Sequence, residues 1–241
     1  MEADKIINGN CWVAYFDILG FKNEIQLSTG HLEVLAYLYG EIIDRINDEL
    51  KEVTGFMALK YECSWFSDSF LFYSSDDSID SYLTIHLAAT SFFDYMTIIK
   101  KWPVRGALTA GDFYANKNKN IYLGKAVVDA YSYAEKQDWI GFVLTPEAYE
   151  KLVTNGHDPF VFVNGLCFIE YNVPIKRKAF ASETERIELG YEKLFAHYYR
   201  DKDCRRDLIV DSVKSVCNNK EVKKEYRRKY ENTLRFYEEI S

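Results

Sequence analysis

The sequence predicts an α+β protein, in which helices pack on a central, mostly antiparallel sheet and further helices follow toward the C-terminus. Two observations lead to this prediction. A pair of strand-like runs joined by a short polar turn lies between two helical stretches, after a first strand and helix. The predicted elements up to residue 171 follow the order β-α-β-β-α-β-β-α-β-α-β. A hairpin between two helices after a first strand–helix unit is typical of a ferredoxin-like α+β sandwich.

The first strand is predicted over Cys11–Leu19, because the nearly continuous apolar run CWVAYFDIL is typical of a strand buried on both faces. The following Gly-Phe-Lys ends this strand. Apolar residues then recur at helical spacing over His31–Val53, and Gly55 ends the helix that they predict.

The hairpin is predicted from two strand-like runs, Phe56–Phe66 and Phe70–Tyr73, on either side of the turn Ser67-Asp68-Ser69. The next helix is expected to begin at Asp76-Asp77-Ser78, because Ser can cap a helix and acidic residues are favourable at its N-terminus. Its apolar pattern extends to about Lys101.

The remaining elements are shorter. Thr145 followed by Pro146 predicts a helix start, because Thr can cap and Pro suits the first turn. A helix is predicted over Gly124–Asp138, and strands over Pro103–Tyr114, Ile121–Leu123, Phe142–Leu144 and Phe160–Tyr171. From about Ser182 the chain becomes rich in charged residues, so we predict a domain over residues 1–180 and a helical extension over 181–241.

Composition excludes several classes of protein. With 241 residues, a formal charge of −7 and an isoelectric point of about 5.3, the chain is too acidic for broad binding to nucleic acid or anionic membranes. The five Cys form no C-x-x-C pair and the four His have no metal-ligand spacing, which argues against a disulfide framework or a zinc site. We find no signal peptide and no apolar run of ~18 residues, and expect a cytoplasmic protein.

Two acidic residues are candidates for chemistry. Asp17 lies inside the most apolar strand, where a carboxylate is costly unless it is paired, hydrogen-bonded or bound to a metal. The alternative is that it caps the next helix. Asp68, taken alone, is best explained as a turn residue. If the strand and the hairpin are neighbours, the two carboxylates converge beside the turn at Gly20. Such a pair suits a hard cation, Mg²⁺ or Mn²⁺, that carries a phosphate ester.

Four motifs, in order over residues 11–144, resemble those of class III nucleotidyl cyclases. FDILGF at Phe16–Phe21 resembles F-x-D-I-x-G-F, shifted only in its first residue. FSDSF at Phe66–Phe70 resembles the hairpin motif that holds the second Asp, with Ser in place of the family's Gly. VRGALTAG at Val104–Gly111 is similar to R-x-G-I-x-x-G, and GKAVVDA at Gly124–Ala130 falls where the family has G-x-x-V-N-x-A.

The resemblance implies a mechanism with two Mg²⁺ or Mn²⁺ ions per site, held by Asp17 and Asp68 with the backbone carbonyl of Ile18 as a further ligand. One ion activates the ribose 3′-hydroxyl for in-line attack on the α-phosphate, and the other holds the leaving pyrophosphate. The resemblance also implies a homodimer with its sites at the interface. The residues that we assign to nucleotide binding are Phe16, Gly20, Phe21, Lys22, Tyr61 and Ser64.

The sequence also departs from the family. Ser64 and Ile121 stand where purine cyclases carry base-reading residues, and Val128 and Ser132 stand where the family has Asn and the transition-state Arg. Either another cation therefore stabilises the developing charge or activity is impaired. We assign this catalytic role to Arg105, ahead of Lys125 and Lys136. The alternative for each of the three is an ordinary cation that lies in solvent or at the edge of a strand. Charged residues of this helix, including Glu135 and Asp138, most often form a solvated, ion-paired face.

These departures resemble the bacterial pyrimidine cyclases of the Pycsar anti-phage system. That resemblance implies UTP or CTP as substrate, and a cyclic UMP or cyclic CMP product that activates a separate effector. We favour UTP, because a smaller base leaves space that Tyr15, Tyr61 or Trp65 could fill, although core packing explains these residues equally well. Two alternatives stay open: a catalytically impaired module that binds a nucleotide or a partner, and a helical interaction protein whose core is only a scaffold.

Overall fold

The computed structural model describes residues 6–21, 32–54, 60–160, 166–181, 184–199, 204–219 and 224–240. The strands are β1 (Ile6–Ile18), β2 (Glu62–Phe66), β3 (Ser69–Tyr73), β4 (Val104–Asn116), β5 (Ile121–Leu123), β6 (Gly141–Leu144), β7 (Leu166–Ala181) and β8 (Thr184–Tyr199). The α-helices are α2 (Leu32–Thr54), α3 (Ile79–Asp94), α4 (Lys125–Lys136), α5 (Pro146–Thr154), α6 (Cys204–Cys217) and α7 (Lys224–Glu239).

All the described strands belong to one sheet, in the order β2-β3-β1-β4-β6-β8-β7, with β5 paired to β4. Its first four strands are antiparallel neighbours, with α2 after β1 and α3 between β3 and β4. This arrangement confirms the predicted ferredoxin-like sandwich. The strand β6 then joins β4 in parallel and extends the sheet toward β8 and β7.

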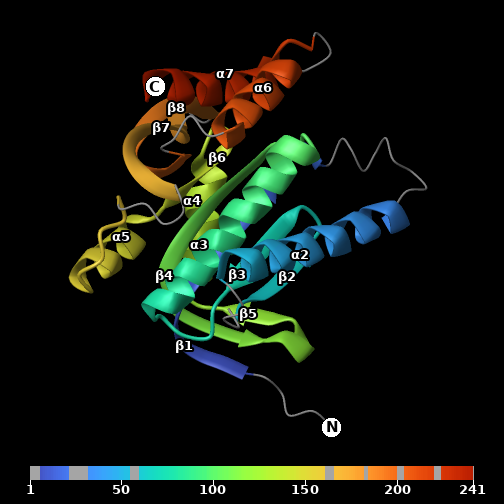
Figure 1. Ribbon diagram of the computed structural model, residues 1–241. Helices are drawn as coiled ribbons and strands as arrows, with labels where there is room; N and C mark the ends of the chain where they lie inside the picture. The colour runs from blue at the N-terminus through green and yellow to red at the C-terminus, as the bar shows by residue number, and fades with distance from the viewer. Residues whose placement is uncertain are drawn as a thin grey trace.

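The central strand β1 is buried on both faces in its middle, as its apolar run predicts. Trp12, Ala14 and Phe16 lie in the larger core, which also contains residues of α2 and α3. Cys11 and Val13 lie in a second core, which contains Ala126 and Ala130 of α4. Because successive side chains of a strand point to opposite faces, this alternation places Asp17 on the α4 face. Figure 1 shows α2 and α3 on the other face.

The helix starts follow the predicted caps. The Ser78 hydroxyl accepts a hydrogen bond from the Ser81 N–H at the start of α3, and the Thr145 hydroxyl accepts one from the Ala148 N–H at the start of α5. The α-helix α3 ends at Asp94, and a π-helical turn over Tyr95–Ile99 completes the stretch predicted as one helix. His31, Gly55 and the first residues of the predicted strand at 56 lie outside the described residues.

The prediction of helices from about Ser182 is wrong. Residues 184–199 form β8, a strand paired along its length with β7, and the helices begin only at Cys204. In β8, Leu194 and Ala196 are buried while Tyr191 and Lys193 are exposed or nearly so. This alternation is the period of a strand, and the high charge of the segment hides it in the sequence. The described part of β7 begins at Leu166, and residues 161–165 of the predicted strand lie outside the described residues.

The two C-terminal helices, α6 and α7, lie together at the end of the molecule that carries β7 and β8 (Figure 1). Thr233 of α7 ties this pair to the sheet, because its Oγ1 accepts a hydrogen bond of 2.8 Å from the Ile140 N–H just before β6. Among the residues that the structure describes, no helix has the length and apolar character needed to cross a membrane.

Candidate functional site

Asp17 and Asp68 lie at the same edge of the sheet. Asp17 is the last residue but one of β1, between Ser69 of β3 and Arg105 of β4. The N–H of the next residue, Ile18, donates a hydrogen bond of 3.0 Å to the Asp68 carbonyl oxygen. The hairpin tip therefore lies directly beside the end of β1. The structure thus brings together the two carboxylates that are 51 positions apart in the sequence.

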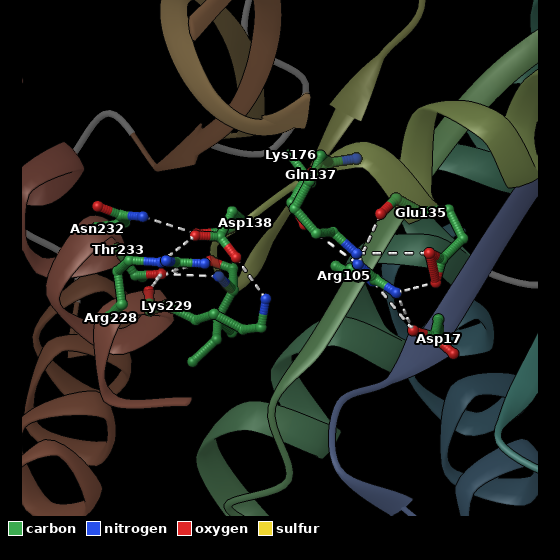
Figure 2. Close-up of polar contacts among 11 residues, drawn as sticks. Asp17, Arg105, Glu135, Gln137, Asp138, Lys176, Arg228, Lys229, Asn232 and Thr233 are labelled. Atoms are coloured by element: carbon green, nitrogen blue, oxygen red, sulfur yellow. Dashed lines mark hydrogen bonds and ion pairs between the residues drawn. The ribbon is translucent and has the colours of Figure 1, made fainter. Parts of the chain in front are cut away.

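Arg105 is almost fully buried, with 5% of its side chain exposed, and its guanidinium contacts Asp17 (Figure 2). Its Nε and Nη2 donate to Asp17 Oδ2 at 3.0 and 2.8 Å. Its Nη1 donates to the carbonyl oxygens of Glu135 and Gln137 at 2.7 and 3.2 Å, and Nη2 also donates to the Glu135 carboxylate. A guanidinium has five N–H donors. All five are used here, so Arg105 has no donor left for a ligand in this arrangement.

The Asp17 carboxyl is under opposing influences. Burial raises its pKa, Arg105 lowers it, and the neighbouring Asp68 and Glu135 carboxylates raise it again, with a net rise above its ordinary value. Asp68 and Asp17 are thus close enough to repel each other. Burial, together with these two carboxylates, also raises the pKa of Tyr15 to about 12, although a hydrogen bond from Ser69 acts in the other direction.

The donor atoms at this edge fit a hard divalent cation. The second oxygen of Asp17, Oδ1, and the Asp68 carboxylate make no hydrogen bond or ion pair within the described part of the chain. Together with the Ile18 carbonyl they form an all-oxygen set, the kind that Mg²⁺ and Mn²⁺ prefer. A cation between the two carboxylates would remove their repulsion. The described residues contain no cluster of three or more Asp, Glu, His or Cys side chains suited to a metal.

The turn after β1 contains a glycine with a positive φ. Gly20 has a φ of +82°, in the region that favours Gly. Phe21 is buried, with its ring edge-to-face against Trp102 at 6.4 Å between centroids. Lys22 lies outside the described residues. The Phe16 side chain points into the core, packed against Phe92, so only its backbone faces the neighbourhood of Asp17.

Three other predicted residues lie at different distances from this edge. Tyr15 is on the same face of β1 as Asp17, and its hydroxyl is 2.6 Å from the Ser69 hydroxyl. Tyr61 instead donates to the Asn47 side chain of α2, at 2.9 Å. The Ser64 hydroxyl is 2.6 Å from that of Tyr122 in β5. Of the three, only Tyr15 adjoins the carboxylate pair in this chain.

Two of the positions that depart from the cyclase motifs, Val128 and Ser132, lie on the outer side of α4. Val128 is 61% exposed, and Ser132 is exposed with its hydroxyl bonded back to the Val128 carbonyl. Lys125 pairs with Asp129 and Glu147, and Lys136 pairs with Glu192. Neither lysine contacts Asp17, and Lys125 lies roughly 15 Å along the helix axis from Glu135.

Two charged residues at the site were not predicted. Glu135, expected on a solvated face, instead binds Arg105 with both its carboxylate and its carbonyl. Lys176 of β7 lies 3.4 Å from the other carboxylate oxygen of Glu135. No local signal marks either residue, because the partners come from strands and helices far apart in the sequence.

Comparisons with known proteins agree on the fold. No protein-family model and no curated protein matches the sequence. Among solved structures, the chain is similar to a double mutant of the guanylyl cyclase domain of the RhoGC fusion protein from the aquatic fungus Blastocladiella emersonii, solved as a monomer. The identity is 13%, the TM-score 0.51, and the match covers 82% of this chain and 98% of that one.

A second similar structure is the catalytic core of a rhodopsin-guanylyl cyclase with converted specificity, in complex with ATPalphaS. Its identity is 12% and its TM-score 0.50, over 82% of this chain and 99% of that one. The chain therefore has the fold of these guanylyl cyclase domains.

Proposed function

We propose that the protein is a nucleotidyl cyclase, which converts a nucleoside triphosphate to its 3′,5′-cyclic monophosphate and pyrophosphate. The observation that carries this proposal is the position of Asp17 and Asp68. Two aspartates from cyclase-like motifs lie side by side at the edge of a sheet that has the fold of cyclase domains. The proposed reaction joins the 3′-oxygen to the α-phosphorus and breaks the bond from that phosphorus to the bridging oxygen. Pyrophosphate leaves with that oxygen, and the hydroxyl proton passes to solvent.

Asp17, Asp68 and the Ile18 carbonyl are the residues that would hold Mg²⁺ or Mn²⁺, two ions per complete site. When bound, such ions make the attacking hydroxyl more acidic and balance the charge of the phosphates. The backbone N–H groups at Gly20 and Phe21, with Lys22, would bind the β- and γ-phosphates. Tyr15 lies beside the carboxylates and limits the space next to them.

The contacts of Arg105 favour a positioning role over direct contact with the phosphates. Because all five of its donors are engaged, Arg105 can orient Asp17 but must break contacts with Asp17 or Glu135 to reach a ligand. Its role as the transition-state cation stays a prediction. In the proposed homodimer, a cation from the second subunit is the other candidate for that role.

We further propose a pyrimidine substrate, UTP before CTP, and a product that signals to a separate effector in anti-phage defence. The support is the resemblance at the base-reading positions. At one of them the Ser64 hydroxyl meets the Tyr122 hydroxyl, so a neutral pair stands where purine cyclases carry a lysine. The neighbouring Ile121 has no hydrogen-bonding side chain.

The test is incubation with each of the four ribonucleoside triphosphates and Mn²⁺, with the products separated by chromatography. We expect cyclic UMP, or cyclic CMP, and an equal amount of pyrophosphate. Cyclic AMP or cyclic GMP as the sole product would contradict the pyrimidine assignment, while no product from any triphosphate would contradict the cyclase itself.

The second candidate function is a nucleotide-binding module without turnover. The observation that favours it is the exposed outer face of α4, where Val128 and Ser132 replace the family's Asn and Arg. Tight binding of a triphosphate with no product after long incubation would support this alternative.

A further inference from the structure

A second polar cluster lies beside the Arg105 site and joins it to the C-terminal helix. Asp138 follows α4, and its side chain is fully buried. Its Oδ2 accepts a hydrogen bond of 2.7 Å from Arg228 Nε, and its Oδ1 accepts one of 2.6 Å from Lys229 Nζ. Both cations belong to α7 (Figure 2). The sequence-based expectation that Asp138 lies on a solvated face is therefore wrong.

The two cations favour the charged form of Asp138. Burial by itself would raise the pKa of Asp138, but the hydrogen bonds from Arg228 and Lys229 outweigh it, and the pKa is lowered. One turn further along α7, Asn232 Nδ2 donates to the Asp138 carbonyl at 2.8 Å. Thr233 bonds the N–H of Ile140, at 2.8 Å, as described above. One face of α7 thus bonds two residues of the loop before β6, Asp138 and Ile140, through side-chain or backbone atoms.

The residue before Asp138 belongs to the Arg105 site. The carbonyl of Gln137 accepts from Arg105 Nη1 at 3.2 Å, and the Gln137 side chain donates to the Gly106 carbonyl at 2.8 Å. Figure 2 shows the two clusters side by side, with Gln137 and Asp138 between them. A displacement of Asp138 would therefore move a carbonyl that fixes Arg105, and with it the orientation of Asp17.

The same helix also reaches the turn after β1. A Cβ placed on Gly20 would lie 3.5 Å from the ring of Tyr226, in the first turn of α7. Gly20 is only three residues from Asp17, and its backbone belongs to the proposed phosphate-binding turn. Helix α7 therefore lies beside the candidate site at two separate points, the Gly20 turn and the Gln137–Asp138 segment.

We propose that α7 is a positioning element of the candidate site. Through Asp138 and Gln137 it holds Arg105 and Asp17 in place, and through Tyr226 it supports the turn at Gly20. This inference rests on the proposed cyclase function, in which Asp17 and the turn are parts of the active site. Arg228, Lys229 and Tyr226 are positioning residues, because each acts on the site through another residue.

The kinetic test compares Lys229→Gln with Arg235→Gln in the full-length protein. Both variants remove one positive charge from α7, but Arg235 is exposed and, within the described part of the chain, its hydrogen bond is to the Tyr191 hydroxyl, at 3.4 Å. We expect kcat of Lys229→Gln to fall about tenfold, the size typical of residues that support a site from behind, with KM within twofold of the wild-type value. Lys229→Arg should restore most of kcat, and Arg235→Gln should leave it unchanged.

A merely structural role predicts a different pattern. If Lys229→Gln has wild-type kcat, or if Arg235→Gln loses as much as Lys229→Gln does, the proposal is wrong. A lower melting temperature in Lys229→Gln with wild-type kcat at 20 °C or below contradicts it as well, because the helix would then only stabilise the fold.

Amide hydrogen exchange keeps this test separate from that of the proposed function. In Lys229→Gln we expect faster exchange in peptides that cover residues 15–21 and 104–108, at least threefold over the wild-type rate, with no change in Arg235→Gln. If the wild-type protein makes no cyclic nucleotide, the proposed function fails and the exchange data alone decide whether α7 holds the Arg105–Asp17 pair. Unchanged exchange in both peptides would overturn the inference.

Discussion

Asp17 and Asp138 are both aspartates paired with basic side chains, yet their surroundings differ in one decisive way. Asp138 is fully buried and both of its oxygens are occupied by cations of α7, so its pKa is lowered. Asp17 is 16% exposed, its Oδ2 alone is bonded among the residues that the structure describes, and its pKa is raised by burial and by Asp68 despite Arg105. A carboxylate whose charge is satisfied on all sides serves the fold. One with an open oxygen beside a second carboxylate can take a ligand.

The comparison also links the two regions. Arg105 and α7 both hold the Gln137–Asp138 segment, from opposite ends. The position of Arg105, the counter-ion of Asp17, therefore depends on the fully bonded Asp138. Variants that alter one of the two aspartates and leave the other intact therefore test whether Asp17 binds a ligand and Asp138 supports the structure.

The largest expected effect is on activity. In Asp17→Asn the side chain keeps its size but loses the charge that would hold a divalent cation. We expect kcat/KM for triphosphate cyclisation to fall by about 10²- to 10³-fold, measured as pyrophosphate release. Asp68→Asn should behave in the same way. The matched control is Asp48→Asn, an exposed aspartate of α2 that pairs with Lys51. Wild-type turnover in Asp17→Asn would remove its metal role.

The next effect is on stability. Asp138→Asn leaves Lys229, whose side chain is 12% exposed, without its anionic partner. Loss of one member of a buried ion pair typically costs about 3 kcal/mol, because the remaining charge stays away from water. We expect this decrease in the free energy of unfolding, measured by urea denaturation. A decrease below about 1 kcal/mol would show that α7 contributes little at this point.

The third effect is on the pH dependence of stability, and it comes from the buried histidines. His86 is stacked on Phe168 with its Nε2 unpartnered in the described structure, and burial lowers its pKa from 6.5 to about 4. His86 is therefore protonated below about pH 6.5 in the unfolded chain, but only near pH 4 in the folded protein. His197, whose ring faces His86 edge-on, has its pKa lowered by burial too.

The His86 contribution to stability is thus complete above pH 6.5 and is lost as the pH falls toward 4. Between pH 7 and pH 5 we expect it to account for roughly 2 kcal/mol of the decrease in unfolding free energy. His86→Phe keeps the ring stack and should remove this part of the pH dependence in denaturant titrations. If the unfolding free energies of the variant and the wild type depend on pH in the same way, His86 binds its proton equally well in the folded and the unfolded chain, and the prediction is wrong.

The smallest effect is expected at a third aspartate, Asp129, which forms an ion pair on the protein surface. Asp129 is paired with Lys125, whose side chain is 60% exposed, on the outer side of α4. Exposed pairs of this kind contribute roughly 0.5 kcal/mol or less. Lys125→Gln should therefore leave both the unfolding free energy and the turnover nearly unchanged. A tenfold loss of turnover would instead identify Lys125 as the cation that the sequence-based assignment gives to Arg105.

Much of the fold could be predicted from local sequence patterns. The strand–helix order of the core, the caps at Ser78 and Thr145 and the hairpin around Asp68 all depend on residues a few positions apart. The one large error concerns β8, where high charge conceals a strand period. A strand that pairs with a long partner can carry charges on its exposed face at little cost, so charge content is a poor guide to helix.

The candidate site could be predicted only in part. The sequence places Asp17 inside the first strand and Asp68 in the hairpin turn, and the structure shows that the end of β1 adjoins this turn. The contacts of Arg105 with Glu135 and Gln137 follow from the way α4 crosses the sheet, which no spacing in the sequence reveals. Likewise, nothing near Asp138 in the sequence indicates that Arg228 and Lys229, some 90 positions away, bind it.

The sequence by itself determined the elements of the core, their order and the two carboxylates that carry the proposed chemistry. These depend on hydrophobic period, turn residues and short motifs, which are local properties of the chain. Only the tertiary structure decided that Asp17 keeps an oxygen available for a ligand, whereas both oxygens of Asp138 are bonded. That difference depends on burial and on the partners that distant strands and helices bring to each oxygen, because the same aspartate is a possible ligand at one depth and a structural anchor at another.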